Sequence, residues 1–180
     1  MSSGYAHSPS PDDEFACSER RCIRRTYAPG MNRRFIRRNS DIEQMLFAAV
    51  RLIRLVAPQM KERRWGRVVH ISSIMAQVSK EKRNVYSATK AALIGMARAS
   101  ALDLGPFGVT VNCIAPGPFM TDMPMSVLSD AEKQAFADRT ALGRWAQPAE
   151  LVGPVLMLCS EAGSYITGQT LFVDGGYLAR

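Results

Sequence analysis

The chain has 180 residues, enough for one ordinary domain, and 47% of them are hydrophobic. Its formal charge is +7, but residues 1–40 hold eight arginines against four acids, which is more than half of that surplus. A positive charge can indicate nucleic-acid binding, but the sequence shows no basic face interleaved with aromatic residues, so we expect none. No apolar run is long enough to cross a membrane.

Residues 1–40 differ in character from the rest of the chain. Two arginine clusters, at 20–25 and 33–38, follow a proline- and acid-rich stretch at 8–14, and no helical or strand period is sustained. Such a segment buries little apolar surface, so we predict a basic, mostly disordered leader at 1–40 and a domain at 41–180.

Helices and short strands alternate from residue 41 onwards. The patterns predict a helix over Ile42–Arg63, a buried strand over Arg67–Ser72, a second long helix over Val85–Leu104 and a strand over Val109–Ala115. A proline- and methionine-rich loop at 116–126 comes next. This alternation predicts an α/β fold, a parallel sheet with helices on both faces.

The C-terminal part contains three further signals. Ser129 and Glu132 have the spacing of a capping box that begins a short helix. Pro148 suits the first position of a last helix that reaches about residue 160, and Pro154 within it predicts a distortion. The final strand is expected over Thr170–Val173.

The most informative residues are Ser73, Tyr86 and Lys90. Tyr86 and Lys90 are four positions apart, so on a helix their side chains share one face. An ammonium beside a phenol favours the phenolate, and a tyrosine in that setting can exchange a proton with a hydroxyl or carbonyl oxygen. Ser73, thirteen positions before Tyr86, can hydrogen-bond the same oxygen. This chemistry suits hydride transfer between an alcohol or ketone and a nicotinamide cofactor.

Other motifs accompany these residues in the expected order. They are Gly66-Arg67-Val68-Val69-His70-Ile71-Ser72-Ser73, Val109-Thr110-Val111-Asn112-Cys113-Ile114-Ala115-Pro116-Gly117, Leu142-Gly143-Arg144 and Ile166-Thr167-Gly168-Gln169-Thr170-Leu171-Phe172-Val173-Asp174-Gly175-Gly176. Together they resemble the classical short-chain dehydrogenase/reductase family from about Asp41 to Gly176, with 3-oxoacyl-carrier-protein reductases and gluconate or sugar dehydrogenases as the nearest branch.

The resemblance implies a Rossmann-like, doubly wound parallel sheet and a role for each matching residue. Ser73 would orient the substrate, Tyr86 would transfer the proton, and Lys90 would assist Tyr86 and hold the nicotinamide ribose. Pro116, Gly117 and Thr121 match the segment that contacts the nicotinamide end of NAD or NADP. Methionines and other apolar residues of the following loop would form a substrate lid: Phe119, Met120, Met123, Pro124 and Met125.

The chain departs from the family in its N-terminal half. It contains no Gly-x-x-x-Gly-x-Gly segment, the loop that cradles the cofactor pyrophosphate, and Met45 lies near the position of the family's catalytic asparagine. The sequence therefore resembles the C-terminal portion of such an enzyme behind an unrelated leader. A shifted reading frame, a misplaced start or a genuine truncation would each produce this pattern. The strand ending near Ser73 would then have an unpaired edge.

Two functions stay open at this level. One is an NAD(P)-dependent oxidoreductase that acts on a small secondary alcohol or carbonyl. The other is a non-catalytic remnant that associates with a full-length relative, since the family assembles as oligomers through elements kept here. We expect a homo-oligomer or a hetero-oligomer in the cytoplasm. Asn112 and His70 are expected to be structural, with their hydrogen bonds satisfied. No metal site is expected, because the four cysteines show neither C-x-x-C spacing nor histidine partners.

Overall fold

The computed structural model describes residues 42–180. The predicted leader at 1–40 lies outside this range. Within it, three strands form a parallel sheet in the order β1-β2-β3: β1 is Gly66–Ile71, β2 is Val109–Pro116 and β3 is Thr170–Val173. Residues of β1 and β2 pair from Gly66 with Val109 to Ile71 with Ile114. The predicted α/β fold with a parallel sheet is confirmed.

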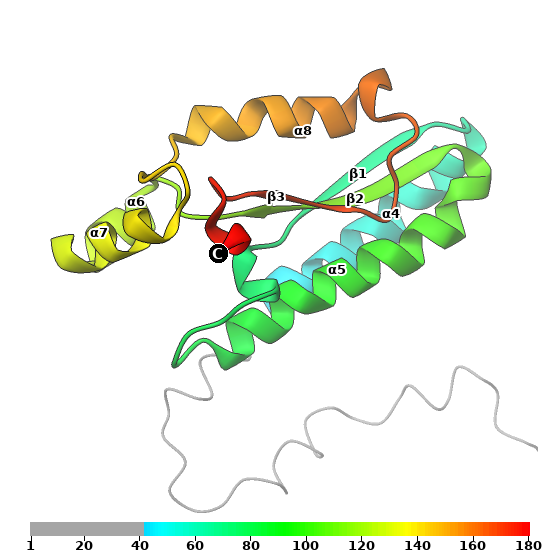
Figure 1. Ribbon diagram of the computed structural model, residues 1–180. Helices are drawn as coiled ribbons and strands as arrows, with labels where there is room; N and C mark the ends of the chain where they lie inside the picture. Colours follow the sequence, from blue (N-terminus) through cyan, green and yellow to red (C-terminus); the bar gives the residue numbers. More distant parts are fainter. Residues whose placement is uncertain (1–41) are drawn as a thin grey trace, which may run out of the picture. The chain divides into compact units, whose positions relative to one another are not determined.

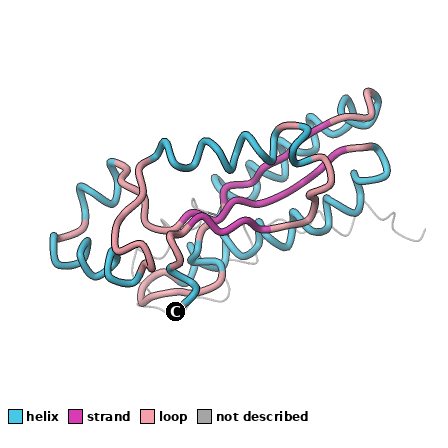
Figure 2. Tube along the Cα trace, turned by 45° about the horizontal axis from the view of Figure 1, so that its top comes forward, coloured by secondary structure: helices cyan, strands magenta, loops and turns pink. Residues whose placement is uncertain are grey.

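Helices cover both faces of this sheet (Figure 1). The long helices α4 (Ala48–Glu62) and α5 (Asn84–Leu104) lie on one face, and α8 (Val152–Cys159) lies on the other. The two shorter helices α6 (Asp122–Val127) and α7 (Asp130–Arg139) lie beyond the end of the sheet. Figure 2 shows the same arrangement, with the three strands enclosed between helices.

The core lies between the sheet and α5. Every residue of β2 except its last is buried, as expected for the central strand of a parallel sheet covered on both faces. Side chains from α5 pack against those of β2 that point to the same face; this cluster comprises Ile94, Ala97, Ala101, Leu104, Val109, Val111 and Cys113. α5 is therefore fixed firmly against the strand that it precedes.

Most predicted elements lie within one residue of their observed bounds, but three details differ. The predicted first helix begins with a π-helical stretch, Glu43–Phe47, before α4. The predicted loop at 116–126 was wrong in part, because α6 occupies Asp122–Val127. Pro124 is compatible with α6 because it lies in the first turn, where a backbone N–H has no helical acceptor.

The third difference concerns the last helix. Pro148 begins a 3₁₀ turn, Pro148–Leu151, and α geometry starts only at Val152. Pro154 cannot donate a hydrogen bond to the carbonyl four residues earlier, which gives a physical reason for the tighter turn before it. The predicted capping box is confirmed: Glu132 N donates to Ser129 Oγ (3.3 Å) and Ser129 N donates to Glu132 Oε2 (2.9 Å).

Candidate active site

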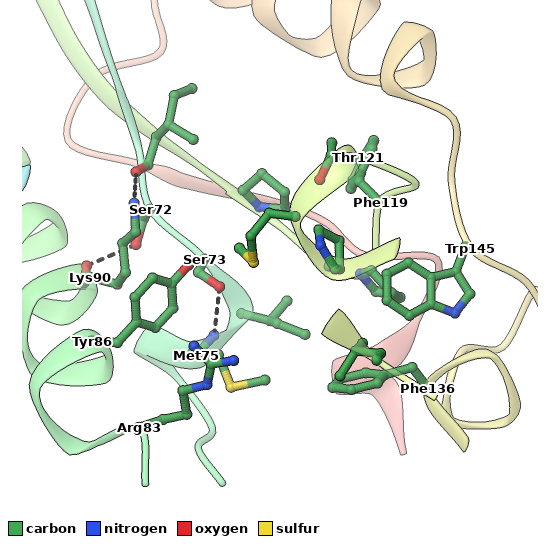
Figure 3. Close-up of a pocket in the computed structure, with 18 of the residues that line it drawn as sticks. Ser72, Ser73, Met75, Arg83, Tyr86, Lys90, Phe119, Thr121, Phe136 and Trp145 are labelled. Atoms are coloured by element: carbon green, nitrogen blue, oxygen red, sulfur yellow. Dashed lines mark hydrogen bonds between the residues drawn. The ribbon is translucent and has the colours of Figure 1, made fainter. Parts of the chain in front are cut away.

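A cavity of about 380 Å³ lies at the carboxyl ends of β1 and β2. In parallel α/β sheets this is the edge where ligands bind. All six residues predicted from the sequence line it, namely Ser73, Tyr86, Lys90, Pro116, Gly117 and Thr121. They come from the end of β1, the first turns of α5, the end of β2 and the start of α6 (Figure 3). The fold thus brings together residues that are up to 48 positions apart in the sequence.

Ser73 occupies the point at which β1 gives way to a 3₁₀ turn, Ile74–Ala76. Its backbone is extended, its side chain caps that turn, and Oγ accepts a hydrogen bond from Met75 N (3.2 Å). Only 8% of the residue is exposed. Because Oγ acts as an acceptor there, and no residue in the described range accepts its proton, the hydroxyl can donate to an oxygen held in the cavity.

Lys90 is fixed by the end of β1. Its Nζ donates to Ile71 O (2.8 Å), and Ser72 Oγ donates to Lys90 O (2.8 Å), so strand and helix are joined twice (Figure 3). Burial lowers the pKa of Lys90, while the nearby Cys113 thiol acts in the opposite direction. The ammonium retains further N–H donors for a ligand.

Tyr86 lies one helical turn before Lys90 and faces the same cavity. The centroid of its ring is 5.7 Å from Lys90 Nζ and 5.8 Å from Arg83 Cζ, so two cations flank the ring. In Figure 3 the Tyr86 hydroxyl is directed toward Ser73. Two hydroxyl groups and an ammonium therefore converge on one region, as proton exchange with a substrate oxygen requires.

The segment after β2 forms the adjoining wall. Gly117 N donates to Val173 O (2.9 Å), which ties this segment to the end of β3. Pro118 O accepts from Ala146 N (3.0 Å), and Met120 N donates to Ala146 O (2.9 Å). Thr121 is exposed and has an extended backbone immediately before α6.

The outer wall is apolar and partly aromatic. Phe136 and Trp145 pack edge to face with their ring centroids 5.6 Å apart, and Trp145 Nε1 donates to Lys133 O (2.8 Å). Of the predicted lid residues, Phe119, Met123 and Pro124 line the cavity, whereas Met120 and Met125 do not.

The charged and aromatic lining residues that sequence reasoning missed include Lys80, Arg83, Phe136 and Trp145. One signal could have identified Phe136, since it is the only aromatic residue in the mostly polar α7. Arg83 also carried a signal, because it immediately precedes the helix that bears Tyr86.

Asn112 has the predicted structural role. It is fully buried on β2, its Nδ2 donates to Ile166 O (2.7 Å), and its Oδ1 accepts from Gln169 N (3.0 Å). It thereby ties β2 to the loop that precedes β3.

His70 is buried on β1, away from the cavity, but its predicted set of hydrogen bonds is incomplete. Nε2 has no partner among the described residues, and burial lowers the pKa of the imidazole. In the same range, no group of three or more His, Cys, Asp or Glu side chains could hold a metal ion.

Known proteins resemble this chain in both sequence and fold. A family model described as enoyl-(acyl carrier protein) reductase matches residues 36–178. The chain belongs to the short-chain dehydrogenase/reductase family. It is 45% identical over 118 residues to a 3-oxoacyl-(acyl-carrier-protein) reductase of Aquifex aeolicus, a match that covers 66% of this chain and 47% of that protein.

Two further similar proteins are named as dehydrogenases. L-rhamnose 1-dehydrogenase (NAD(P)(+)) of Azotobacter vinelandii is 39% identical over 126 residues, covering 69% of this chain and 49% of its own length. The structure of a gluconate 5-dehydrogenase from Burkholderia cenocepacia, in complex with NADP and tartrate, has a TM-score of 0.78 at 29% identity. That match covers 86% of this chain and 59% of that one. The chain thus spans about half the length of the curated relatives that it matches.

Proposed function

We propose that these residues form the substrate-binding and proton-transfer part of an NAD(P)-dependent oxidoreductase acting on a secondary alcohol or carbonyl. One observation carries this proposal: six residues chosen from the sequence, on four separate segments, line a single cavity. Family membership supports oxidoreductase chemistry and a nicotinamide cofactor. Among the described residues, no helix has the length and apolar character needed to cross a bilayer.

The proposed proton transfer begins at Tyr86. In the reducing direction, its hydroxyl donates a proton to the substrate oxygen while Ser73 donates a hydrogen bond to the same atom. The Lys90 ammonium stabilises the negative charge that develops on the phenol oxygen. In the oxidising direction, the phenolate accepts the proton of the alcohol.

The lining residues fit the nicotinamide end of NAD or NADP. The remaining N–H groups of Lys90 can donate to ribose hydroxyls, and the segment containing Pro116, Gly117 and Thr121 lies at the sheet edge where such cofactors bind. When bound, the nicotinamide supplies or takes up the hydride. The apolar wall at Phe119 and Trp145 excludes water from the reacting atoms.

The names of the relatives indicate the range of possible substrates. A 3-oxoacyl-(acyl-carrier-protein) reductase, an L-rhamnose dehydrogenase and a gluconate dehydrogenase all match this chain. We therefore propose a small alcohol or carbonyl compound as substrate.

Titration of the purified chain with NADH and NADPH, followed by cofactor fluorescence, tests this proposal. We expect binding in the micromolar range for the parent and for Tyr86→Phe. That variant should lose about 100- to 10,000-fold in the rate of carbonyl reduction, the usual contribution of a positioned general acid. Absence of binding at millimolar concentrations of either cofactor would refute the proposal.

A second candidate is association with a relative without catalysis. α4 exposes Leu52 (62%) and Leu55 (76%), and within residues 42–180 the outer edge of β1 pairs with no strand. Apolar surface and free strand edges both favour contact with another chain. Light scattering after size-exclusion chromatography tests self-association through this surface: we expect an oligomer for the parent and dissociation for Leu55→Glu, and a monomeric parent would contradict self-association.

A further inference from the structure

The charges that line the cavity are all of one sign. Lys80, Arg83 and Lys90 contribute to its wall, and none of its lining residues is an aspartate or glutamate. Positive charge gathered around a mostly apolar cavity favours a ligand that carries a negative charge. The question is which of the three cations is available to bind it.

Two of these cations are less available than the third, Lys90 because it donates a hydrogen bond and Lys80 because a carboxylate, Glu132, lies near it. Lys90 donates to Ile71 O at the end of β1. Lys80 Nζ lies 5.0 Å from the centroid of the Phe136 ring. Lys80 also contributes to lowering the pKa of Glu132, although the hydrogen bonds from Ser129 are the larger cause. Its charge is therefore partly balanced by α7.

Arg83 differs from both lysines. It immediately precedes α5 and is half-buried, and its Cζ is 5.8 Å from the Tyr86 ring centroid. In the described range, its guanidinium has neither a hydrogen-bond acceptor nor a carboxylate partner. Figure 3 shows the side chain extending past the Tyr86 ring toward Ser73 and Met75.

The contact with the ring positions Arg83 without occupying its donors. A cation–π interaction holds the guanidinium near the aromatic ring, and the N–H groups remain available for an acceptor. Guanidinium groups match the geometry of a carboxylate with two parallel hydrogen bonds, which makes arginine more selective for this group than lysine.

We infer that Arg83 forms a subsite for a carboxylate on the substrate, so that the cavity selects short oxo- or hydroxycarboxylic acids. This inference rests on the proposed function, because it places the reacting oxygen at Tyr86 and Ser73. Since the Arg83 guanidinium lies beside the ring that bears the reacting hydroxyl, we expect the carboxylate and the carbonyl to be separated by only a few carbon atoms. The apolar wall at Phe119 and Phe136 then receives the remaining carbon chain.

A charged acid and its neutral methyl ester, which have the same carbonyl group and carbon chain, test the subsite. The chain is titrated at neutral pH with 4-oxopentanoate and with its methyl ester, and binding is followed by two-dimensional amide NMR. A charge-assisted hydrogen bond contributes enough free energy for about a tenfold preference for the acid over the ester. Arg83→Gln should abolish this preference, and Arg83→Lys should restore part of it.

Arg98→Gln is the matched control. Arg98 is an exposed arginine on the same helix and lines a different cavity, so its substitution should leave the preference unchanged. Equal binding of acid and ester, a preference that survives Arg83→Gln, or no binding of either probe would overturn the inference. Displacement of the acid by inorganic phosphate at constant ionic strength would identify a phosphate site instead and would also overturn it.

The two proposals can fail separately. Loss of cofactor binding together with a charge preference that depends on Arg83 would refute the oxidoreductase function and leave the anion subsite intact. Cofactor binding and carbonyl reduction with no preference for the acid would leave the function intact and refute the subsite.

Discussion

Gly117 provides a direct test of how the cavity wall is held. Its backbone passes so close to β3 that a Cβ atom built there would lie 2.6 Å from Asp174 Cα and 2.8 Å from Asp174 Cβ. Non-bonded carbon atoms in proteins do not approach one another this closely. Gly117→Ala must therefore move the segment after β2 away from Asp174 or break the hydrogen bond from Gly117 N to Val173 O.

The expected loss of stability follows from the two Asp174 atoms that the new Cβ would clash with. Both are close to the backbone, and Asp174 is itself fixed because its carboxylate accepts hydrogen bonds from Gly176 N (2.9 Å) and Leu178 N (3.0 Å). Overpacking against such a neighbour costs about 1–3 kcal/mol. We expect Gly117→Ala to lower the free energy of unfolding by about 2 kcal/mol, measured by urea denaturation and circular dichroism.

Gly95→Ala is the matched control. Gly95 lies inside α5, and a Cβ atom there would meet nothing within 4 Å. Since alanine favours a helix over glycine, this variant should be more stable than the parent by about 0.5–1 kcal/mol. Equal stability of Gly117→Ala and the parent would refute the reasoning, because it would mean that the two segments are not in contact.

Three further predictions concern residues outside the cavity. Asn112→Ala removes both hydrogen bonds of a fully buried side chain and leaves two partly buried backbone groups without these partners, so it should cost about 2–4 kcal/mol in urea denaturation; a loss below about 1 kcal/mol would contradict this role. Burial lowers the pKa of His70, so the unfolded chain binds the proton more readily. Stability should fall as the pH drops below about 6.5, and less so in His70→Leu, in denaturation curves recorded across that range. Burial raises the pKa of Cys113 to about 11, so its thiol should react slowly with an alkylating reagent, whereas Cys159 is exposed. Peptide mapping after alkylation should show Cys159 modified and Cys113 protected until the chain unfolds, and prompt labelling of both would count against the buried position of Cys113.

The strands and the main helices could be predicted because their signals are local. The apolar run at Val109–Ala115 is typical of a central parallel strand, and it is buried as expected. The capping box at Ser129 needs only four consecutive residues and was found at its predicted place. α6 was missed because prolines and methionines favour a loop by composition, whereas Pro124 is acceptable in a first turn.

The grouping of the site residues needed a different kind of information. Spacing alone places Tyr86 and Lys90 on one helical face, but it does not place Gly117 or Thr121 beside them. The family resemblance supplied that link, and the shared cavity agrees with it. Trp145 escaped prediction because its position depends on tertiary packing, whereas the position of Arg83 just before the helix of Tyr86 was a local signal that was not used. The roles of the site residues, the oligomeric state, the cytoplasmic location and the nature of residues 1–40 stay predictions.

Within residues 42–180, three contacts shape the cavity. Ser73 is held by its own 3₁₀ turn, Lys90 by the end of β1, and Gly117 by β3. These contacts hold the residues that we propose to exchange a proton with the substrate. We therefore predict that substrate binding and cofactor binding can be measured independently on this chain. Recognition of an oxo acid through Arg83 without NAD(P) binding would show that residues 42–180 suffice for the substrate site and not for the cofactor site.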